Sequence, residues 1–365
     1  MSKIVVIADF IYPNFLGGSA RYVYDMIKGF DYNNIDFLLI TRKKYGVFAL
    51  ENEHDMFFDK IIKDGKVIEI AGLKDLFNSF KYIKKDDILN IHHPILGIFY
   101  SLFKVNNINT YFFHGPLHDE YKAMKDSKIG FFIRYILQKI VLMNTSKVLV
   151  LSDFMKNKVL DIYSKSKVYK IGPIFDAKKF KCDIPKDELR IKYNIPLNKK
   201  VLFTSRRLTN RTGVLELVDN FIRDFDYNEY HLIIVGKGEL QLELEEKIKN
   251  TKNINYFKFV SEKKLVELMA LSSVYVLPTK ELEGFGLVIL EALSLNLPVV
   301  VSDKAGGGTD FIKHHNQNLI FEIENFSVSL KEKINYVFNK KILIDVNKFD
   351  YKIVSRNIYE QCLQN

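Results

Sequence analysis

Two glutamates stand eight residues apart around a Gly-Phe-Gly turn in the stretch PTKELEGFGLVILEAL, residues 278–293. If a helix begins near Gly286, Glu283 and Glu291 are separated by roughly 12 Å along its axis, because each helical residue rises about 1.5 Å. At that separation the two carboxylates are not expected to share a metal ion or a proton. We therefore expect them to accept hydrogen bonds from hydroxyl groups at two ends of one extended ligand. In the alternative, Glu283 caps the helix and Glu291 lies on the surface.

Glycine-containing loops that lead into helices are candidate phosphate sites. Free N–H groups at a helix N-terminus carry partial positive charge, and glycine lets the backbone approach a ligand. Gly17-Gly18, Gly236-Lys237-Gly238 and the Gly284–Leu287 turn all follow strand-like runs. A plain turn is the alternative for Gly17-Gly18, and the Gly236-Lys237-Gly238 loop taken singly is a weak signal. The dinucleotide fingerprint G-x-G-x-x-G is absent after the first strand-like run, which argues against a nicotinamide cofactor.

Three arginines, Arg206, Arg207 and Arg211, lie between a strand-like run and the helix-like run that begins near Gly213. Their charges repel one another unless an anion lies among them, and the guanidinium fork matches the oxygens of a phosphate. We interpret this loop as an anion site; a solvated loop is the alternative.

Histidines follow two other strand-like runs. His92 and His93 come after DILNI, and His114 ends TYFFH. A single histidine at the end of a strand is more often structural than catalytic. His114 is the stronger candidate, because Gly115 and Pro116 hold it in a turn where a neutral imidazole could bond a polar substrate.

The elements that must position these residues are strands alternating with helices. Eleven apolar runs typical of buried strands occur, six before residue 152 and five after residue 200. This alternation predicts an α/β fold with two doubly wound parallel sheets, whose ligands bind beyond the carboxyl ends of the strands. The turn-rich stretch 171–196 predicts the connection between the halves. We place the domains at 1–175 and 176–345, with a last helix, 346–365, docking on one of them.

Composition narrows the class of protein. A chain of 365 residues exceeds one hydrophobic core, and its 47% hydrophobic residues can fill two. No run of about 18 uncharged apolar residues is present, so we expect a cytoplasmic protein. Cys182 and Cys362 have no partner motif nearby, which argues against a disulfide framework or a cysteine zinc site.

The net charge of +10 is concentrated in residues 101–180, which hold 14 Lys and Arg against 6 Asp and Glu. Within that region, 119–143 could form an amphipathic helix that contacts an anionic membrane. In the alternative, its apolar residues pack into the core beneath a basic outer face. The basic residues are Lys122, Lys125, Lys128, Arg134 and Lys139, and the apolar ones are Phe131, Phe132, Ile133, Ile136 and Leu137.

Together the motifs resemble the retaining nucleotide-sugar glycosyltransferases of family 4, which have the GT-B fold. Glu283-GFGLVIL-Glu291 is similar to the family's E-x7-E motif, SRRLTNRTG to its G-R-L-x-x-x-K-G loop, and LIIVGKGE and FKFVSEKKL to later stretches. The first half resembles the family more loosely, through GGSAR, His114 and VLVLSDFMKNKV. The resemblance implies two Rossmann-like domains facing a central cleft, with the C-terminal helix crossing back to the N-terminal domain.

Three positions depart from the family pattern. Thr212 stands where the family usually has lysine, so the resemblance leaves Arg211 as the second cation for the diphosphate. The family's I-P-N-G-V-D turn reads IGPIFD at 171–176, and its G-G-x-x-E motif ends in Asp310.

The resemblance also implies roles for individual residues. Arg207 and Arg211 would stabilise the leaving diphosphate, Glu283 and His114 would hold sugar hydroxyls, and Glu291 would hold the ribose. A nucleophile from the enzyme is not expected. A metal ion is not expected either, because no D-x-D motif stands at the end of a strand and cationic side chains can do its work. The residues implied at the nucleotide sugar are Gly17, Gly18, Arg207, Arg211, Gly236, Val260, Glu283, Gly284, Phe285, Gly286, Leu287 and Glu291.

The implied activity moves a sugar from a UDP- or GDP-sugar to a glycan or lipid-linked acceptor, in cell-surface polysaccharide or glycolipid synthesis at the inner face of the membrane. A sugar-nucleotide epimerase or phosphorylase-like GT-B enzyme is the first alternative. A non-catalytic sugar or nucleic-acid binding protein is the second. No nucleic-acid partner is expected, since no aromatic-basic motif typical of RNA readers is present.

Overall fold

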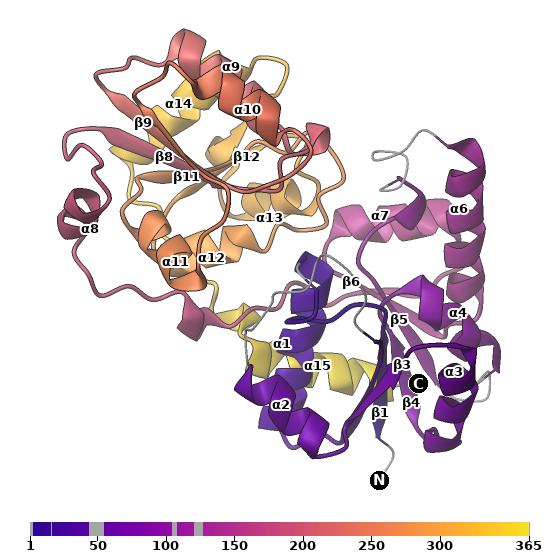
Figure 1. Cartoon of the computed structure of the whole chain (residues 1–365). Helices are drawn as coiled ribbons and strands as arrows, with labels where there is room; N and C mark the ends of the chain where they lie inside the picture. Colours follow the sequence, from indigo (N-terminus) through magenta and orange to yellow (C-terminus); the bar gives the residue numbers. More distant parts are fainter. Residues whose placement is uncertain (1–2, 16, 44–54, 104–107, 120–126, 365) are drawn as a thin grey trace. The chain divides into compact units, whose positions relative to one another are not determined.

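The computed structural model describes residues 3–15, 17–43, 55–103, 108–119 and 127–364. These divide into two units (Figure 1). The first unit comprises Met1–Phe175 and Lys348–Asn365, and the second unit comprises Asp176–Asn347. Each unit is built on one parallel sheet and is described by itself.

The sheet of the first unit has seven parallel strands in the order β3-β2-β1-β4-β5-β6-β7. Strand order reverses direction at β1, as in doubly wound folds, and the switch lies between β1 and β4. The strands are β1 (Ile4–Ala8), β2 (Phe37–Arg42), β3 (Val67–Ile70), β4 (Ile88–Ile91), β5 (Asn109–Phe113), β6 (Lys147–Val150) and β7 (Val168–Lys170). The helices are α1 (Gly18–Tyr32), α2 (Met56–Lys63), α3 (Leu73–Ser79), α4 (Pro94–Phe103), α6 (Lys128–Met143), α7 (Asp153–Ile162) and α15 (Tyr351–Leu363).

The second unit repeats the plan with six parallel strands in the order β10-β9-β8-β11-β12-β13. The strands are β8 (Lys200–Ser205), β9 (Tyr230–Val235), β10 (Ile254–Phe257), β11 (Val274–Leu277), β12 (Val299–Ser302) and β13 (Ile320–Phe321). The helices are α8 (Lys186–Lys192), α9 (Val214–Asp224), α10 (Gln241–Ile248), α11 (Glu262–Ala270), α12 (Val288–Ser294), α13 (Gly307–Asn316) and α14 (Phe326–Asn339).

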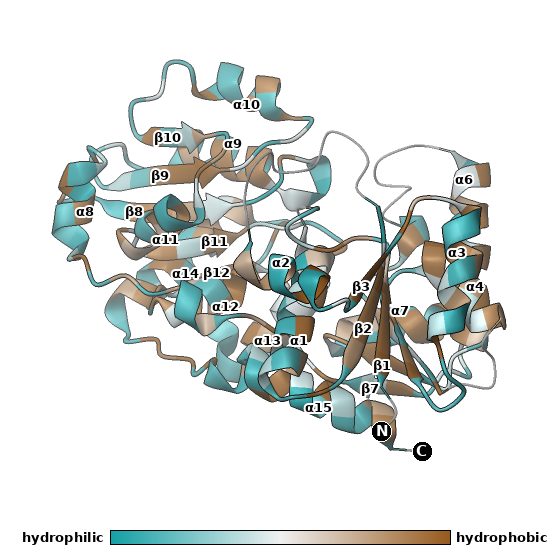
Figure 2. Ribbon diagram, turned by 60° about the horizontal axis from the view of Figure 1, so that its bottom comes forward, coloured by the Kyte–Doolittle hydropathy of each residue, from teal (hydrophilic) through white to brown (hydrophobic). Residues whose placement is uncertain are grey.

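Burial explains why these segments become strands. All residues of β1, β5 and β9 are buried, as expected of parallel strands covered by helices on both faces. Figure 2 shows the strand β1, IVVIA, coloured as hydrophobic along its length. The eleven apolar runs seen in the sequence all form strands, and the predicted α/β architecture is confirmed.

The C-terminal helix α15 packs against α1 in the first unit, which confirms the predicted crossing back. Asn33 Nδ2 donates to the carbonyl of Lys352 at 2.8 Å, and a Cβ on Gly29 would meet Ser355 Oγ at 2.1 Å. The chain leaves and re-enters this unit at one place, where the Phe175 N–H donates to the Phe349 carbonyl at 3.2 Å. Glycine at position 29 is therefore required for the close approach of the two helices.

Within the described part of the chain, no helix is both long enough and apolar enough to cross a membrane.

Candidate functional site

The loop after β8 delivers a buried arginine to the first glutamate of the motif. Arg206 Nη2 forms an ion pair with Glu283 Oε2, and the two side chains are 12% and 14% exposed. Tyr275 on the neighbouring strand β11 fixes the preceding residue, because its hydroxyl donates to the Ser205 carbonyl at 3.0 Å. Among the described residues, Arg206 Nε is buried without a hydrogen-bond partner. The guanidinium therefore uses Nη2 for Glu283 and leaves its Nε donor without a partner.

Both glutamates of the motif act on Arg206. Burial alone would lower the pKa of Arg206, but Glu283, Tyr275 and Glu291 outweigh that effect and raise the pKa above its ordinary value. Glu291 lies half-buried in the first turn of α12. Sequence reasoning included Arg206 in an anion site but did not foresee that it pairs with Glu283.

The other two arginines take different places. Arg207 is exposed, whereas Arg211 is half-buried and its Nη1 donates to the Leu282 carbonyl at 3.0 Å. Arg211 therefore lies next to the residue that precedes Glu283. Arg206 and Arg211 thus both reach the 282–283 turn, whereas Arg207 is exposed.

Thr212, the departure from the family pattern, is buried and holds the loop together. Its hydroxyl donates to the carbonyl of Arg207 at 2.7 Å and accepts from the N–H of Thr209 at 3.3 Å. A capping box of this kind shapes the turn before α9. The Thr212 side chain consequently serves the loop's own backbone.

Glycines allow these loops to touch. Gly213 has φ +69°, and a Cβ there would lie 1.9 Å from the carbonyl oxygen of Pro278. A Cβ on Gly236 would lie 1.8 Å from the carbonyl oxygen of Arg206. These approaches bring the loops after β8, β9 and β11 together at the carboxyl edge of the sheet, where ligands bind in open parallel sheets.

The Gly-Phe-Gly turn differs in one detail from the sequence expectation. The helix α12 begins at Val288 rather than near Gly286, because Gly286 has φ +77° and cannot belong to a right-handed helix. Phe285 is buried and its ring packs against Phe311 at 5.2 Å. Gly284 and Leu287 are half-buried on either side of it. Phe285 thus anchors the turn to α13.

The remaining predicted residue of this unit, Val260, is half-buried in the loop between β10 and α11, next to the helix cap Ser261.

In the first unit, Gly17 and Gly18 are exposed at the N-terminus of α1, and a Cβ on either would meet nothing within 4 Å. Packing within the unit does not require glycine at these positions. They stay candidates for backbone contact with a ligand.

The predicted residue His114 lies at the end of β5 in contact with a second histidine. His92 Nδ1 and His114 Nε2 are 2.9 Å apart, and His92 Nε2 is 2.6 Å from Asn90 Oδ1. Burial lowers the pKa of His92 and of His114 well below the ordinary value. Both imidazoles are therefore neutral at physiological pH.

Close by, His93 and Asp9 form a separate pair of buried groups. The Asp9 N–H donates to His93 Nδ1 at 3.2 Å, and the Asp9 carboxylate accepts from the Leu96 N–H at 2.9 Å. Burial lowers the pKa of His93 to about 3 and raises that of Asp9 to about 6. Sequence reasoning gave His92 and His93 equal standing, whereas the structure gives them different partners.

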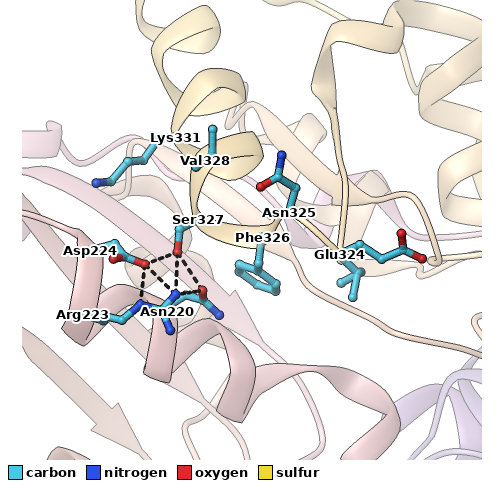
Figure 3. A pocket seen from close by; sticks show the side chains of 10 residues that line it. Asn220, Arg223, Asp224, Glu324, Asn325, Phe326, Ser327, Val328 and Lys331 are labelled. Atoms are coloured by element: carbon cyan, nitrogen blue, oxygen red, sulfur yellow. Dashed lines mark hydrogen bonds and ion pairs between the residues drawn. The ribbon is translucent and has the colours of Figure 1, made fainter.

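A surface pocket of about 510 Å³ lies elsewhere on the second unit, between the end of α9 and the start of α14 (Figure 3). Four of its polar side chains, Asn220, Arg223, Asp224 and Ser327, bond one another: Asp224 accepts from Arg223 Nη2 at 2.7 Å and from the Ser327 hydroxyl. None of its lining residues was predicted as a site residue. Among the described residues, no group of three or more His, Cys, Asp and Glu side chains is arranged to hold a metal ion.

Comparison with known proteins gives a family for the second unit. Residues 185–352 match the family model described as "Glycosyl transferases group 1". The capsular polysaccharide biosynthesis glycosyltransferase CapM of Staphylococcus aureus is 25% identical over 317 residues, which are 78% of this chain and 80% of that protein. A probable sucrose-phosphate synthase of Thermosipho melanesiensis is 24% identical over 372 residues, covering 89% of this chain and 85% of that protein.

Solved structures share the fold over nearly the whole chain. HepE of Anabaena, solved in complex with UDP and glucose, superposes with a TM-score of 0.72 at 16% identity, covering 99% of both chains. Sucrose-phosphate synthase of Thermosynechococcus elongatus also gives a TM-score of 0.72 at 16% identity, covering 99% of this chain and 94% of that one.

Proposed function

We propose that this chain, whose residues 185–352 match the glycosyl transferases group 1, transfers a sugar from a UDP- or GDP-sugar to a glycan or lipid-linked acceptor, with retention of configuration. The observation that carries this proposal is the convergence of Arg206, Arg211 and the Glu283–Glu291 motif at the carboxyl edge of one parallel sheet. Cationic and hydroxyl-binding groups side by side suit a ligand that joins a diphosphate to a sugar.

The arginines supply the charge that the leaving diphosphate needs. Negative charge develops on the leaving group in the transition state, and donors fixed in advance at that place accelerate the reaction. Arg211 is held at the Leu282 carbonyl, and Arg207 is exposed and able to reach a ligand. Because guanidiniums can do the work that a metal ion does elsewhere, we propose metal-independent transfer.

The two glutamates bind rather than attack. Arg206 is paired with one oxygen of the Glu283 carboxylate through a charge-assisted bond. A carboxylate held in this way is better suited to accept hydrogen bonds from sugar hydroxyls than to attack as a nucleophile. Glu291 would accept from the ribose hydroxyls. The backbone of the Gly284–Leu287 turn, with Gly236 and Val260 in the neighbouring loops, would complete the donor site of the second unit.

The first unit would bind the acceptor. It would also contact the donor, with His114 at a hydroxyl of the transferred sugar and the backbone of Gly17 and Gly18 at the diphosphate. A role in synthesis of a cell-surface polysaccharide or glycolipid is supported by CapM, whose name places that protein in capsular polysaccharide biosynthesis.

A test of the activity begins with the donor. UDP-, GDP- and ADP-sugars are compared by the rise in melting temperature, since a ligand that binds the native state stabilises it. The product formed from the best donor is then examined by NMR for the configuration of the new anomeric carbon. Free sugar or an epimer as the sole product would contradict transfer, and an inverted product would contradict retention.

Two variants test the residue roles. Glu291→Ala should raise KM for the sugar nucleotide, because it removes a ground-state contact. Arg207→Ala should mainly lower kcat, because it removes a positive charge that stabilises the leaving diphosphate. Unchanged kinetics in both variants would remove this site assignment.

The exposed apolar side chains of α6 support the proposal that the acceptor is linked to a membrane lipid. Ile129, Phe132, Ile133 and Ile136 follow helical spacing and are 75%, 61%, 51% and 37% exposed. The alternative in which the segment's apolar residues fill the core is therefore wrong for Phe132, Ile133 and Ile136, since the buried residues of α6 are Gln138, Val141 and Leu142.

Basic side chains accompany this apolar stripe. Lys128 is exposed, and Arg134 and Lys139 are half-buried on the same helix; Lys122 and Lys125 lie outside the described residues. On the helix that packs beside α6, Phe103 is 61% exposed. An apolar stripe with adjacent cations suits the interface of an anionic bilayer, so we propose that the enzyme works at the cytoplasmic face of a membrane.

Flotation with vesicles of phosphatidylcholine alone or mixed with phosphatidylserine tests this surface. The wild type should float with the anionic vesicles and be released by salt, and Phe132→Ser with Ile133→Ser should prevent flotation. Ile191→Ser is the matched control, because Ile191 is a 66% exposed apolar residue on α8 of the second unit. Equal flotation of all variants, or no flotation of the wild type, would contradict the membrane proposal.

A further inference from the structure

Four polar side chains form an unbroken hydrogen-bonded chain that runs along β4 and β5 to the residues that follow their carboxyl ends. The chain runs from His114 through His92 and Asn90 to Thr110, with contacts of 2.9, 2.6 and 2.9 Å. The register explains how it forms, because Asn90 is paired with Thr110 across the two parallel strands. Side chains two residues apart share a face of a sheet, so the residues at 90 and 92 lie beside those at 110 and 114.

The donor and the acceptor of each hydrogen bond can be assigned by starting from Thr110, at the end of the chain opposite His114. The Thr110 hydroxyl donates to the Leu89 carbonyl at 3.0 Å, so its oxygen accepts from Asn90 Nδ2. The amide of Asn90 then has only its carbonyl oxygen for His92, which must donate from Nε2. Asn90 thereby fixes which nitrogen of His92 carries the proton.

The same reasoning reaches His114. A neutral imidazole carries one proton, so His92 with its proton on Nε2 offers a lone pair at Nδ1. His114 Nε2 lies 2.9 Å from that lone pair and must donate to it. The proton of neutral His114 is therefore on Nε2, and its Nδ1 is an acceptor that makes no hydrogen bond with the described residues.

Ring contacts keep the two imidazoles from turning over. His92 stacks on Phe112 with the ring centroids 5.3 Å apart and an interplanar angle of 8°. His114 lies over His93 at 5.4 Å, and the edge of Tyr22 meets it at 5.5 Å. A ring turned over between these neighbours would lose its hydrogen-bond partner, so the order of donors and acceptors is fixed.

We propose that His92 is a positioning residue that, held by Asn90, presents His114 Nδ1 as a hydrogen-bond acceptor for a hydroxyl or N–H group of the bound substrate. This inference rests on the proposed function only in taking that substrate to be a sugar.

The arrangement has a consequence for specificity. A lone pair in a buried setting attracts a donor and repels another lone pair, and a site built to bond a donor rejects analogues that lack it. A sugar with a hydroxyl at this position is therefore accepted, whereas one with a carboxylate or an ether oxygen there is rejected. Protonation of His114, which would reverse this selection, is opposed by its burial.

The first experiment reads the proton positions without any substrate. In the full chain labelled with 15N-histidine, two-dimensional NMR at neutral pH should show His114 protonated at Nε2 and unprotonated at Nδ1. It should also show a scalar coupling across the hydrogen bond to His92 Nδ1. His231 in the second unit, whose Nε2 bonds Asn255 at 2.6 Å, is an internal reference. A proton on His114 Nδ1, or on His92 Nδ1, overturns the proposal.

The second experiment uses two variants of one shape. Asparagine and leucine side chains have the same number of heavy atoms and the same branching at Cγ, but only His92→Asn places an acceptor near the former Nδ1. With the sugar nucleotide that the donor screen identifies, His92→Leu should lower kcat/KM about tenfold, the worth of one fixed hydrogen bond, and His92→Asn should restore most of it. Equal losses in both variants would mean that His92 only fills space. The expected NMR pattern without any sugar transfer would instead refute the proposed function and leave the proton order intact.

Discussion

Replacement of Arg206 by methionine tests the Arg206–Glu283 ion pair in the candidate site of the second unit. Arg206→Met keeps the apolar stem and removes the guanidinium, which leaves the Glu283 carboxylate 14% exposed without its partner. Breaking a buried pair by removing one member typically costs about 3–5 kcal/mol. Because Arg211 is still present in the adjacent loop, we expect the lower end, about 3 kcal/mol.

Hydrogen–deuterium exchange is the suitable assay, since the two units can unfold separately and a global transition would mix them. A loss of about 3 kcal/mol corresponds to roughly a hundredfold faster exchange in the most protected amides of β8 and β11. Amides of β1 in the first unit should not change. Lys200→Met provides a control, because the Lys200–Glu229 pair is 30% and 48% exposed and such pairs contribute less than about 1 kcal/mol.

A double variant separates the pair from other effects. Arg206→Met with Glu283→Gln removes both charges, so its cost should fall below the sum of the two single costs by about 2 kcal/mol. Strictly additive costs, or an Arg206→Met effect no larger than that of Lys200→Met, would refute the inference that this ion pair organises the site.

Two further predictions concern stability. His93 has a pKa of about 3 in the folded protein against an ordinary 6.5, so its contribution to the free energy of unfolding is complete above pH 6.5 and is lost as the pH falls. Between pH 7 and pH 4.5, protonation of this histidine should lower the free energy of unfolding by about 3 kcal/mol. Asp9, with a folded pKa of about 6, changes the free energy of unfolding in the opposite direction. Chemical denaturation of the wild type and of His93→Asn at both pH values should therefore separate the contribution of the histidine. The same pH dependence in both proteins would contradict the burial of His93 as a neutral group. Gly213→Ala should cost more than about 2 kcal/mol, since its Cβ would lie 1.9 Å from the Pro278 carbonyl. Gly65→Ala, with a similar φ of +67° but open space around it, should cost only about 1 kcal/mol, and equal melting temperatures for the two variants would exclude a clash.

The strands were predictable because each carries its own signal. A parallel strand buried on both faces is a nearly continuous apolar run, and IVVIA, NTYFF and YHLIIV need no neighbour to be recognised. The two strands without a predicted run, β7 and β13, have three and two residues, and β7 is only partly buried. Such short edge segments become strands through pairing with β6 and β12, which the local sequence does not reveal.

The residues of the candidate site could be singled out from the sequence, but their pairings could not. The placement of the E-x7-E motif after a strand and the singling out of His114 both came from the local sequence, since glycine, proline and charge after an apolar run are local features. The start of α12 was misplaced by two residues, because the positive φ of Gly286 is decided by how the turn packs against α13.

The sequence by itself determined which segments are strands and which loops can carry chemistry, because both follow from the properties of consecutive residues. Only the tertiary structure decided that Arg206 meets Glu283 and that His92 meets His114. β8 lies beside β11, three strands later in the chain, and β4 and β5 match Asn90 with Thr110. Strand order and register arise from the packing of whole layers. The partner of a loop residue is therefore set by which strand becomes its neighbour, and no spacing along the chain records it.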